Sequence, residues 1–154
     1  MKSLQGTINS LSGDKSITHR AIILASLAEG VSEIVDYLPS EDCQRTIDAF
    51  RLMGVSIEQN PQSLRIHGKG LHGLQEPSNV IDCGNSGTTL RLLTGLLTGQ
   101  SFFSVLTGDD SLRKRPMRRV IEPLRKMNAH IHGRSDSTLA PLAIRGRDIA
   151  AMDY

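Results

Sequence analysis

The chain has 154 residues, a formal net charge of +2 and an aromatic content of only 3%, with no tryptophan. This length allows one ordinary domain or two small units, and their core must be aliphatic. The charge is too small to indicate a nucleic-acid partner by itself, and no apolar run is long enough to span a membrane. Cys43 and Cys83 lie far apart, and we find no signal peptide, which predicts reduced thiols in a cytoplasmic protein.

The first half of the chain reads as a strand, a helix, a strand, a helix and a hairpin. A β-branched stretch precedes a small-residue turn, after which apolar residues recur at helical spacing up to Gly30. Ser40 is a candidate cap for the second helix. The expected bounds are 2–9 for the leading strand, 15–28 and 40–53 for the helices, and 31–35, 55–58 and 64–67 for the later strands. A Gly-rich link over residues 68–77 follows.

The same order of elements then recurs. Strands are expected over 80–83 and 101–106, helices from Gly84 through 97 and from Arg115 or Pro116 to 127, and a hairpin over 130–132 and 142–145. Local similarities lie in register with this order, since residues 48–55 resemble 122–129 and residues 64–68 resemble 142–146. The simplest interpretation is an α/β (α+β) protein with two copies of a β-α-β-α-β-β unit, over 13–76 and 77–154.

The turn before the first helix gathers groups that suit an anion. Asp14 or Ser16 can cap the helix, and the backbone N–H groups that follow have no partners inside it. Lys15 adds positive charge, and Arg20 lies one turn from Ser16 on the same face. A Walker A loop is excluded, because no glycine directly precedes Lys15. The alternative is that Lys15 and Arg20 are ordinary solvated charges, and internal ion pairs at both would remove the anion site.

A second turn, residues 84–89, occupies the equivalent place in the second unit. Asn85 can cap the helix, Gly87 lets a ligand approach the backbone, Thr88 and Thr89 offer hydroxyl groups, and Arg91 lies one turn further on. Turns rich in glycine and threonine are common without any ligand. The pairing with the first turn is stronger evidence. We call these two strand-to-helix turns the first and second corner, and we expect them to lie side by side at a common pocket.

The third cluster, residues 113–119, holds five cations in seven residues. Such a run is usually a solvated face, and a nucleic-acid patch is the next interpretation. No aromatic residues alternate with the cations to stack bases, which disfavours single-strand binding. The run follows the acidic pair Asp109 and Asp110 in a loop, where Arg115, directly before Pro116, could contact an anionic small molecule.

Other candidate chemistry is weaker. His130 and His132 share one face of a strand, but two histidines without a nearby carboxylate or cysteine do not form a metal site. Cys83 could act as a nucleophile, but no partner base can be assigned, and a buried free cysteine is the usual case. We expect no metal and no cofactor.

Together, the three turns resemble the amino-terminal part of the 5-enolpyruvylshikimate-3-phosphate synthase family, the 3-phosphoshikimate 1-carboxyvinyltransferases. The sister family of UDP-N-acetylglucosamine enolpyruvyl transferases is less similar, because it has a different opening turn. It also typically has a cysteine in the loop before the third helix start, where this chain has none. The matching stretches are Gly13-Asp14-Lys15-Ser16-Ile17-Thr18-His19-Arg20-Ala21, Gly84-Asn85-Ser86-Gly87-Thr88-Thr89-Leu90-Arg91 and Leu112-Arg113-Lys114-Arg115-Pro116-Met117.

The resemblance implies a fold and a reaction. The fold would be an inside-out barrel of β-α-β-α-β-β units, three to each of two domains, with residues 1–12 forming a strand that crosses to the other domain. The reaction would move the enolpyruvyl group of phosphoenolpyruvate onto the 5-hydroxyl of shikimate 3-phosphate and release phosphate, without metal or cofactor. Both substrates are polyanions, so charge stabilisation by cations and helix ends is expected.

The resemblance also assigns residues. Lys15 would touch both substrates, Ser16 and Arg20 would hold shikimate 3-phosphate, and Gly87 and Arg115 would hold phosphoenolpyruvate. Lys15 and Arg115 are the residues expected to take part in catalysis. Glyphosate, which takes the phosphoenolpyruvate place in this family, would crowd Gly87 and is an expected inhibitor. The residues expected to shape the second turn are Asn85, Thr88 and Arg91.

Family members are more than twice as long, so the third unit and the carboxyl-terminal domain, with its carboxylate acid/base groups, are expected to be absent here. We therefore expect an enzyme fragment that is inactive alone, needs the missing carboxyl-terminal part as its partner, and could pair with a second copy through its exposed surface. No nucleic acid or membrane partner is expected. The alternative is a non-catalytic module that binds phosphorylated anions.

Overall fold

A computed structural model describes residues 13–152 of the chain. The leading strand expected over 2–9 lies outside the described residues. The first half contains two helices and three strands, and the second half has the same kinds of element with additions. The elements are α1 (Lys15–Leu27), β1 (Glu29–Val35), α2 (Glu41–Leu52), β2 (Ser56–Gln59), β3 (Ser63–Lys69), β4 (Ile81–Asp82), α3 (Gly87–Thr98), β5 (Phe103–Thr107), the 3-10 turn η1 (Leu112–Lys114), α4 (Arg118–Lys126), β6 (His130–Gly133), α5 (Arg134–Ser137) and β7 (Leu139–Arg145).

The strands form two separate sheets. The first has the order β1-β3-β2 and is antiparallel, and the second has the order β4-β5-β7-β6, in which only β4 and β5 run parallel. Both expected hairpins are confirmed, since Ser56 pairs with His67 and His130 pairs with Arg145. In both sheets the second strand of the hairpin lies between the first hairpin strand and an earlier strand, so the two halves share an arrangement.

Each of the three helices α1, α2 and α3 begins at a side-chain cap. The carboxylate of Asp14 accepts a hydrogen bond from the Ile17 N–H at 2.8 Å, and Ser40 Oγ accepts one from the Cys43 N–H at 3.3 Å. Ser86 Oγ accepts from the Thr89 N–H at 3.1 Å. A capping oxygen satisfies a donor that the helix cannot, which fixes where the helix begins. The expected caps Asp14 and Ser40 are therefore confirmed, but the cap of α3 is Ser86 rather than Asn85.

The expected start of the fourth helix at Arg115 or Pro116 is wrong. Arg115 has an extended backbone (φ −78°, ψ 128°) at the end of η1, and α4 begins at Arg118. The ring of Pro116 disfavours helical angles at the residue before it, so Arg115 cannot belong to the helix. Gly30 does not stop the first helix either. It lies inside β1 with φ +89°, and α1 has already ended at Leu27.

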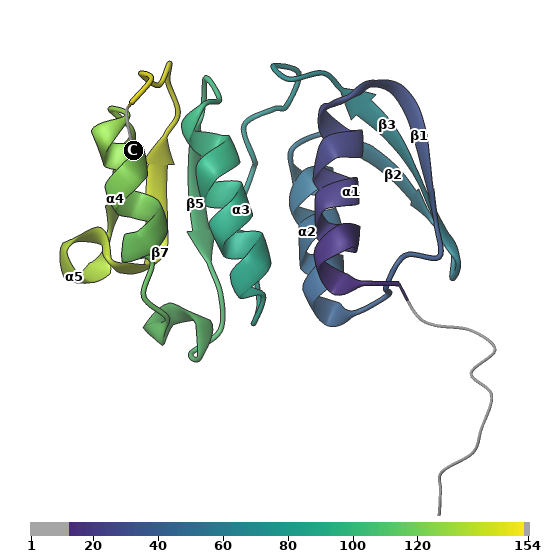
Figure 1. The fold of residues 1–154 in the computed structure, drawn as a ribbon, viewed down its shortest axis with the longest axis horizontal. Helices are drawn as coiled ribbons and strands as arrows, with labels where there is room; N and C mark the ends of the chain where they lie inside the picture. The colour runs from purple at the N-terminus through teal and green to yellow at the C-terminus, as the bar shows by residue number, and fades with distance from the viewer. Residues whose placement is uncertain (1–12, 153–154) are drawn as a thin grey trace, which may run out of the picture.

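Helices cover one face of each sheet and meet between the sheets. Helices α1 and α2 pack on the first sheet, α3 packs on β5 and β7, and α3 also contacts both α1 and α2 (Figure 1). The buried apolar residues of both halves form one continuous cluster that is mostly aliphatic, with Tyr37, Phe50 and Phe102 as its aromatic members. The molecule is therefore a mixed α/β protein in which three helices share an interior. None of the helices among residues 13–152 has the length and apolarity needed to cross a bilayer.

This core generates a stability prediction. Leu93 on α3 is fully buried, whereas Leu71 in the link between the two halves is 57% exposed. Leu93→Ala should lower the free energy of unfolding by about 2–5 kcal/mol, because it removes buried methyl groups and leaves a cavity. Leu71→Ala should change it by less than about 0.5 kcal/mol. Urea unfolding followed by circular dichroism measures both, and equal losses would contradict the shared core.

Candidate functional site

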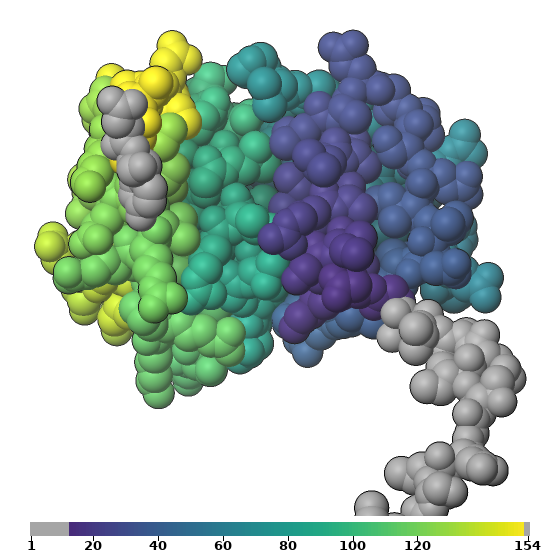
Figure 2. Space-filling view, viewed as in Figure 1, coloured from purple at the N-terminus to yellow at the C-terminus, as the bar shows by residue number. Residues whose placement is uncertain are grey.

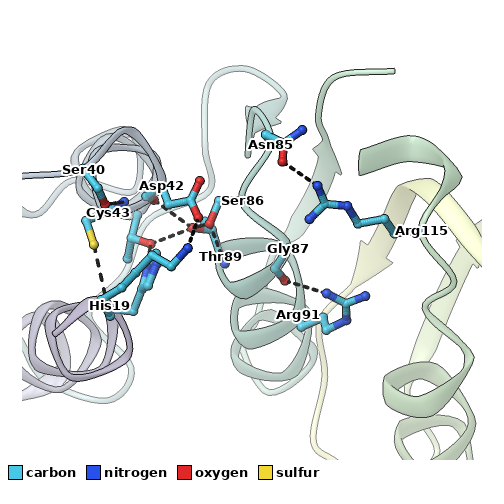
Figure 3. Close-up of polar contacts among 12 residues, drawn as sticks. His19, Ser40, Asp42, Cys43, Asn85, Ser86, Gly87, Thr89, Arg91 and Arg115 are labelled. Carbon is cyan, nitrogen blue, oxygen red and sulfur yellow. Dashed lines mark hydrogen bonds and ion pairs between the residues drawn. The ribbon is translucent and has the colours of Figure 1, made fainter. Parts of the chain in front are cut away.

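The two predicted corners lie side by side, with the start of α2 between them. Lys15 Nζ at the start of α1 lies 2.9 Å from Asp42 Oδ2 in the first turn of α2. Thr89 in the first turn of α3 donates from Oγ1 to the backbone oxygen of Asp42 at 3.3 Å. Three helix N-termini therefore meet, and Figure 3 shows polar contacts among the residues there. Each presents unpaired backbone N–H groups and the positive end of its dipole, which favours a bound anion.

Lys15 is not free where these helix ends meet. Its ion pair with Asp42 leaves its side chain 51% exposed and that of Asp42 28% exposed. The hydrogen bond and the charge of Asp42 raise the pKa of Lys15, so the ammonium group stays protonated. The condition that both cations be free of internal pairs is thus met only in part, and an anion that binds Lys15 must compete with Asp42. Arg20 donates to the backbone oxygen of Ser16 at 3.0 Å, and both residues are exposed.

A buried chain of hydrogen bonds fixes the three helices to one another. His19 Nδ1 lies 2.7 Å from Thr46 Oγ1, Thr46 Oγ1 lies 2.8 Å from Thr89 Oγ1, and Thr89 Oγ1 lies 2.7 Å from Ser86 Oγ. His19 is fully buried, and its Nε2 has no hydrogen-bond partner among the described residues. Sequence reasoning missed this chain, because its partners are up to 43 residues apart and no local motif links them.

Gly87 lies beneath two guanidinium groups. Arg91 Nη1 donates to the Gly87 backbone oxygen at 3.3 Å, and Arg115 donates to Asn85 Oδ1 beside it (Figure 3). A Cβ added at Gly87 would lie 2.6 Å from Arg91 Nη1 and 3.2 Å from Arg115 Nη1. The absence of a side chain at position 87 therefore lets the Arg91 guanidinium lie against the backbone, and any other residue would have to displace it.

The basic run of residues 113–119 does not form one patch. Arg113 pairs with Asp110 and Arg118 pairs with Glu122, while Arg115 turns toward the second corner. A cavity of about 610 Å³ lies beside this run, between α3 and α4. It is lined by Arg91, Pro116, Arg118, Arg119 and Val120. This dispersal disfavours a nucleic-acid surface, which needs its cations on one face.

The two cysteines are free thiols and are buried. Burial is the main cause that raises the pKa of Cys83 to about 12, so this thiol is not a nucleophile at neutral pH. Burial likewise raises the pKa of Cys43. Within residues 13–152, no group of three or more histidine, cysteine, aspartate or glutamate side chains is arranged to hold a metal ion.

The buried histidine generates a pH prediction. Burial is the main cause that lowers the pKa of His19, whereas an unfolded histidine titrates near about 6.5. The unfolded state therefore binds the extra proton first, and folding stability from this group is lost as the pH falls below about 6.5. His19→Gln should lose less free energy of unfolding than the wild type between about pH 7.5 and about pH 5.5. Urea unfolding at both pH values measures this, with His132→Gln at an exposed position as control. An identical loss in the wild type and His19→Gln would contradict the assignment.

Comparisons with known proteins agree with these motifs. The family model for EPSP synthase (3-phosphoshikimate 1-carboxyvinyltransferase) matches residues 1–154. A relative from Pelobacter propionicus is 58% identical over 142 residues, which are 92% of this chain and 33% of that protein. One from Geobacter sulfurreducens is 56% identical over 153 residues, 99% of this chain and 35% of that protein. Both are named 3-phosphoshikimate 1-carboxyvinyltransferase.

The structural comparison gives the same result. EPSP synthase from Acinetobacter baumannii has a TM-score of 0.91 and 44% sequence identity, over 94% of this chain and 33% of that chain. This chain thus spans about a third of the length of the relatives it matches. It belongs to the EPSP synthase (3-phosphoshikimate 1-carboxyvinyltransferase) family.

Proposed function

We propose that the chain supplies part of the site of an enzyme that moves the enolpyruvyl group of phosphoenolpyruvate onto the 5-hydroxyl of shikimate 3-phosphate and releases phosphate. This reaction belongs to the shikimate pathway of aromatic amino-acid biosynthesis. The family membership supports the activity. The observation that carries the proposal is the meeting of three helix N-termini, with Lys15 at the start of α1 and the Arg115 guanidinium beside Gly87 at the start of α3. Such an arrangement suits a reaction between two polyanions.

The corner at α1 would bind shikimate 3-phosphate. Lys15, Ser16 and Arg20 are exposed on the first turns of this helix, where a phosphate would meet backbone N–H groups and the positive end of the dipole. Arg20 is tethered to the Ser16 backbone oxygen by one nitrogen, Nη1, which leaves other guanidinium N–H groups for a phosphate. The phosphate would take Lys15 from Asp42 or share it.

The corner at α3 would bind phosphoenolpyruvate between Gly87, Arg115 and Lys15. A guanidinium group suits carboxylate and phosphate, and both cations would stabilise the charge that develops during transfer. Lys15 and Arg115 are therefore the proposed catalytic residues of this chain. The supporting residues would be Asn85, Thr88 and Arg91. Glyphosate would occupy the same place as phosphoenolpyruvate.

We also propose that residues 13–76 and 77–154 are two copies of the β-α-β-α-β-β unit of an inside-out barrel. The shared strand order of the two sheets supports this, as does the side-chain cap at the first helix of each unit. The first copy begins with a helix and would take its first strand from residues 1–12. That strand, which would cross to the other domain, lies outside the described residues. The cytoplasm is the proposed location, where the buried thiols would stay reduced.

The exposed face of α1 is a proposed interaction surface. Helix α1 lies on the surface in Figure 2, and its Ile17 and Leu24 are 69% and 68% exposed. Large exposed apolar side chains grouped on one helix mark an interaction surface. In the complete enzyme the two thirds of the relatives' length that this chain does not span would cover it. In the chain alone, a second copy would.

Gly87→Ala in the complete enzyme should weaken binding of phosphoenolpyruvate and of glyphosate about tenfold. The added methyl group would displace Arg91 and Arg115, and overpacking of this kind costs about 1–3 kcal/mol. Affinity for shikimate 3-phosphate should stay within about twofold. The control is Gly95→Ala on the same helix, where an added Cβ meets no atom within 4 Å. Steady-state kinetics and inhibitor titration measure both variants. Equal affinities of Gly87→Ala and Gly95→Ala for phosphoenolpyruvate would contradict the assignment of Gly87.

The 154-residue chain alone should release no phosphate from the two substrates, because the catalytic groups must converge from both domains within a closed cleft. Adding a separate polypeptide that matches the remaining two thirds of the relatives should restore phosphate release. Release above background by the chain alone would contradict this prediction. The alternative, a non-catalytic anion-binding module, predicts ligand binding by the chain but no activity in the mixture.

A further inference from the structure

Two loops that carry the proposed phosphoenolpyruvate residues are joined backbone to backbone. The N–H of Asp109, just after β5, donates to the Gly84 backbone oxygen at 2.9 Å in the turn before α3. A Cβ at Gly108 would lie 2.4 Å from that same oxygen, so only glycine allows this approach. The loop leading to Arg115 is thereby held against the turn that contains Asn85.

The carboxylate of Asp109 bonds to both loops. Its Oδ1 accepts the Leu112 N–H at 2.7 Å, and its Oδ2 accepts Asn85 Nδ2 at 2.8 Å. These bonds, with that of Asn85 the largest cause, lower the pKa of Asp109, so it is a carboxylate at neutral pH. An ionised carboxylate can only accept hydrogen bonds.

This one-way chemistry sets the direction of the Asn85 amide. Because Asp109 accepts only, Asn85 must turn its NH₂ group toward Asp109 and its oxygen toward the Arg115 guanidinium, which only donates. The reversed amide would place donors against donors on Arg115 and acceptor against acceptor on Asp109. The amide thus transmits the polarity of Asp109 to Arg115.

We propose that Asp109 is a positioning residue for the phosphoenolpyruvate site: through Asn85, it holds the Arg115 guanidinium beside Gly87. This proposal rests on the proposed function for its substrate. Asp109 would act on one side of the site only, since Lys15, Ser16 and Arg20 make no described contact with it. The chain offers a matched control in Asp110, an exposed neighbour of the same type that bonds the Arg113 side chain.

The test uses the complete enzyme with Asp109→Asn, Asp109→Glu and Asp110→Asn. Asn at 109 has one acceptor oxygen, and the backbone N–H of Leu112 can only donate to it. The NH₂ group introduced by Asp109→Asn would then face the NH₂ group of Asn85, so the Asn85 bond is lost or the Asn85 amide reverses, and either change removes the acceptor from Arg115. Asp109→Asn should raise the KM for phosphoenolpyruvate about tenfold while the KM for shikimate 3-phosphate stays within about twofold. Asp109→Glu keeps both acceptors and should recover part of the loss, and Asp110→Asn should match the wild type. Equal phosphoenolpyruvate KM values for Asp109→Asn and Asp110→Asn, or equal losses for both substrates, would overturn the proposal.

A double-mutant cycle separates positioning from simple loop stability. In an Asn85→Ala background, Asp109→Asn should cause no further loss of phosphoenolpyruvate affinity, because the link is already broken. Full additivity would overturn the proposal. A crystal structure of Asp109→Asn gives a readout independent of substrate: the Arg115 guanidinium should leave Asn85, and an unmoved guanidinium would overturn the proposal. A wild-type enzyme that does not bind phosphoenolpyruvate would instead count against the proposed function.

Discussion

The structure depends on holding three helix N-termini together at one end of the molecule. Aligned helix ends repel one another, since each carries a partial positive charge. The carboxylate of Asp42 offsets part of that charge, because it lies in the first turn of α2 and pairs with Lys15 of α1. Buried hydrogen bonds among the hydroxyl groups of Thr46, Thr89 and Ser86 also join α2 to α3. The helix ends and cations still carry net positive charge, which a bound anion would neutralise. The fold and the proposed site therefore have the same physical origin.

The polar groups around this end divide the work between two corners. At the first, Asp42 occupies Lys15 until a stronger anion arrives, which would keep the ammonium group in place without burying it. At the second, Gly87 lets two guanidinium groups lie close to the helix backbone, and Asn85 fixes the direction of one of them. Because protein electrostatic groups stabilise a transition state best when they are already oriented, such fixed contacts suit the proposed transfer of an enolpyruvyl group between two polyanions.

Much of the fold could be predicted from the sequence, because helix periodicity, caps at Asp14 and Ser40, and hairpin turns are local signals. The sequence also predicted that two corners would meet, and Arg115 stays a predicted contact of the second. The sequence could not identify the partners Asp42 and Asp109 of these corners, or the chain from His19 to Thr89, because these contacts join residues 24 to 47 positions apart. The start of α4 was misplaced although Pro116 carried the signal against it. The ion pair of Lys15 required the packed helices.

The central claim is that the corners at α1 and α3 serve one anion-binding site. Titration of the isotope-labelled protein with shikimate 3-phosphate, followed by backbone amide shifts, tests this most directly. The account predicts that Lys15 and Ser16 show the largest shifts, that the shifts of Gly87 and Thr88 give the same dissociation constant, and that binding weakens with added salt. Shifts confined to the cavity at Arg118 and Arg119, or unrelated dissociation constants at the two corners, would contradict it.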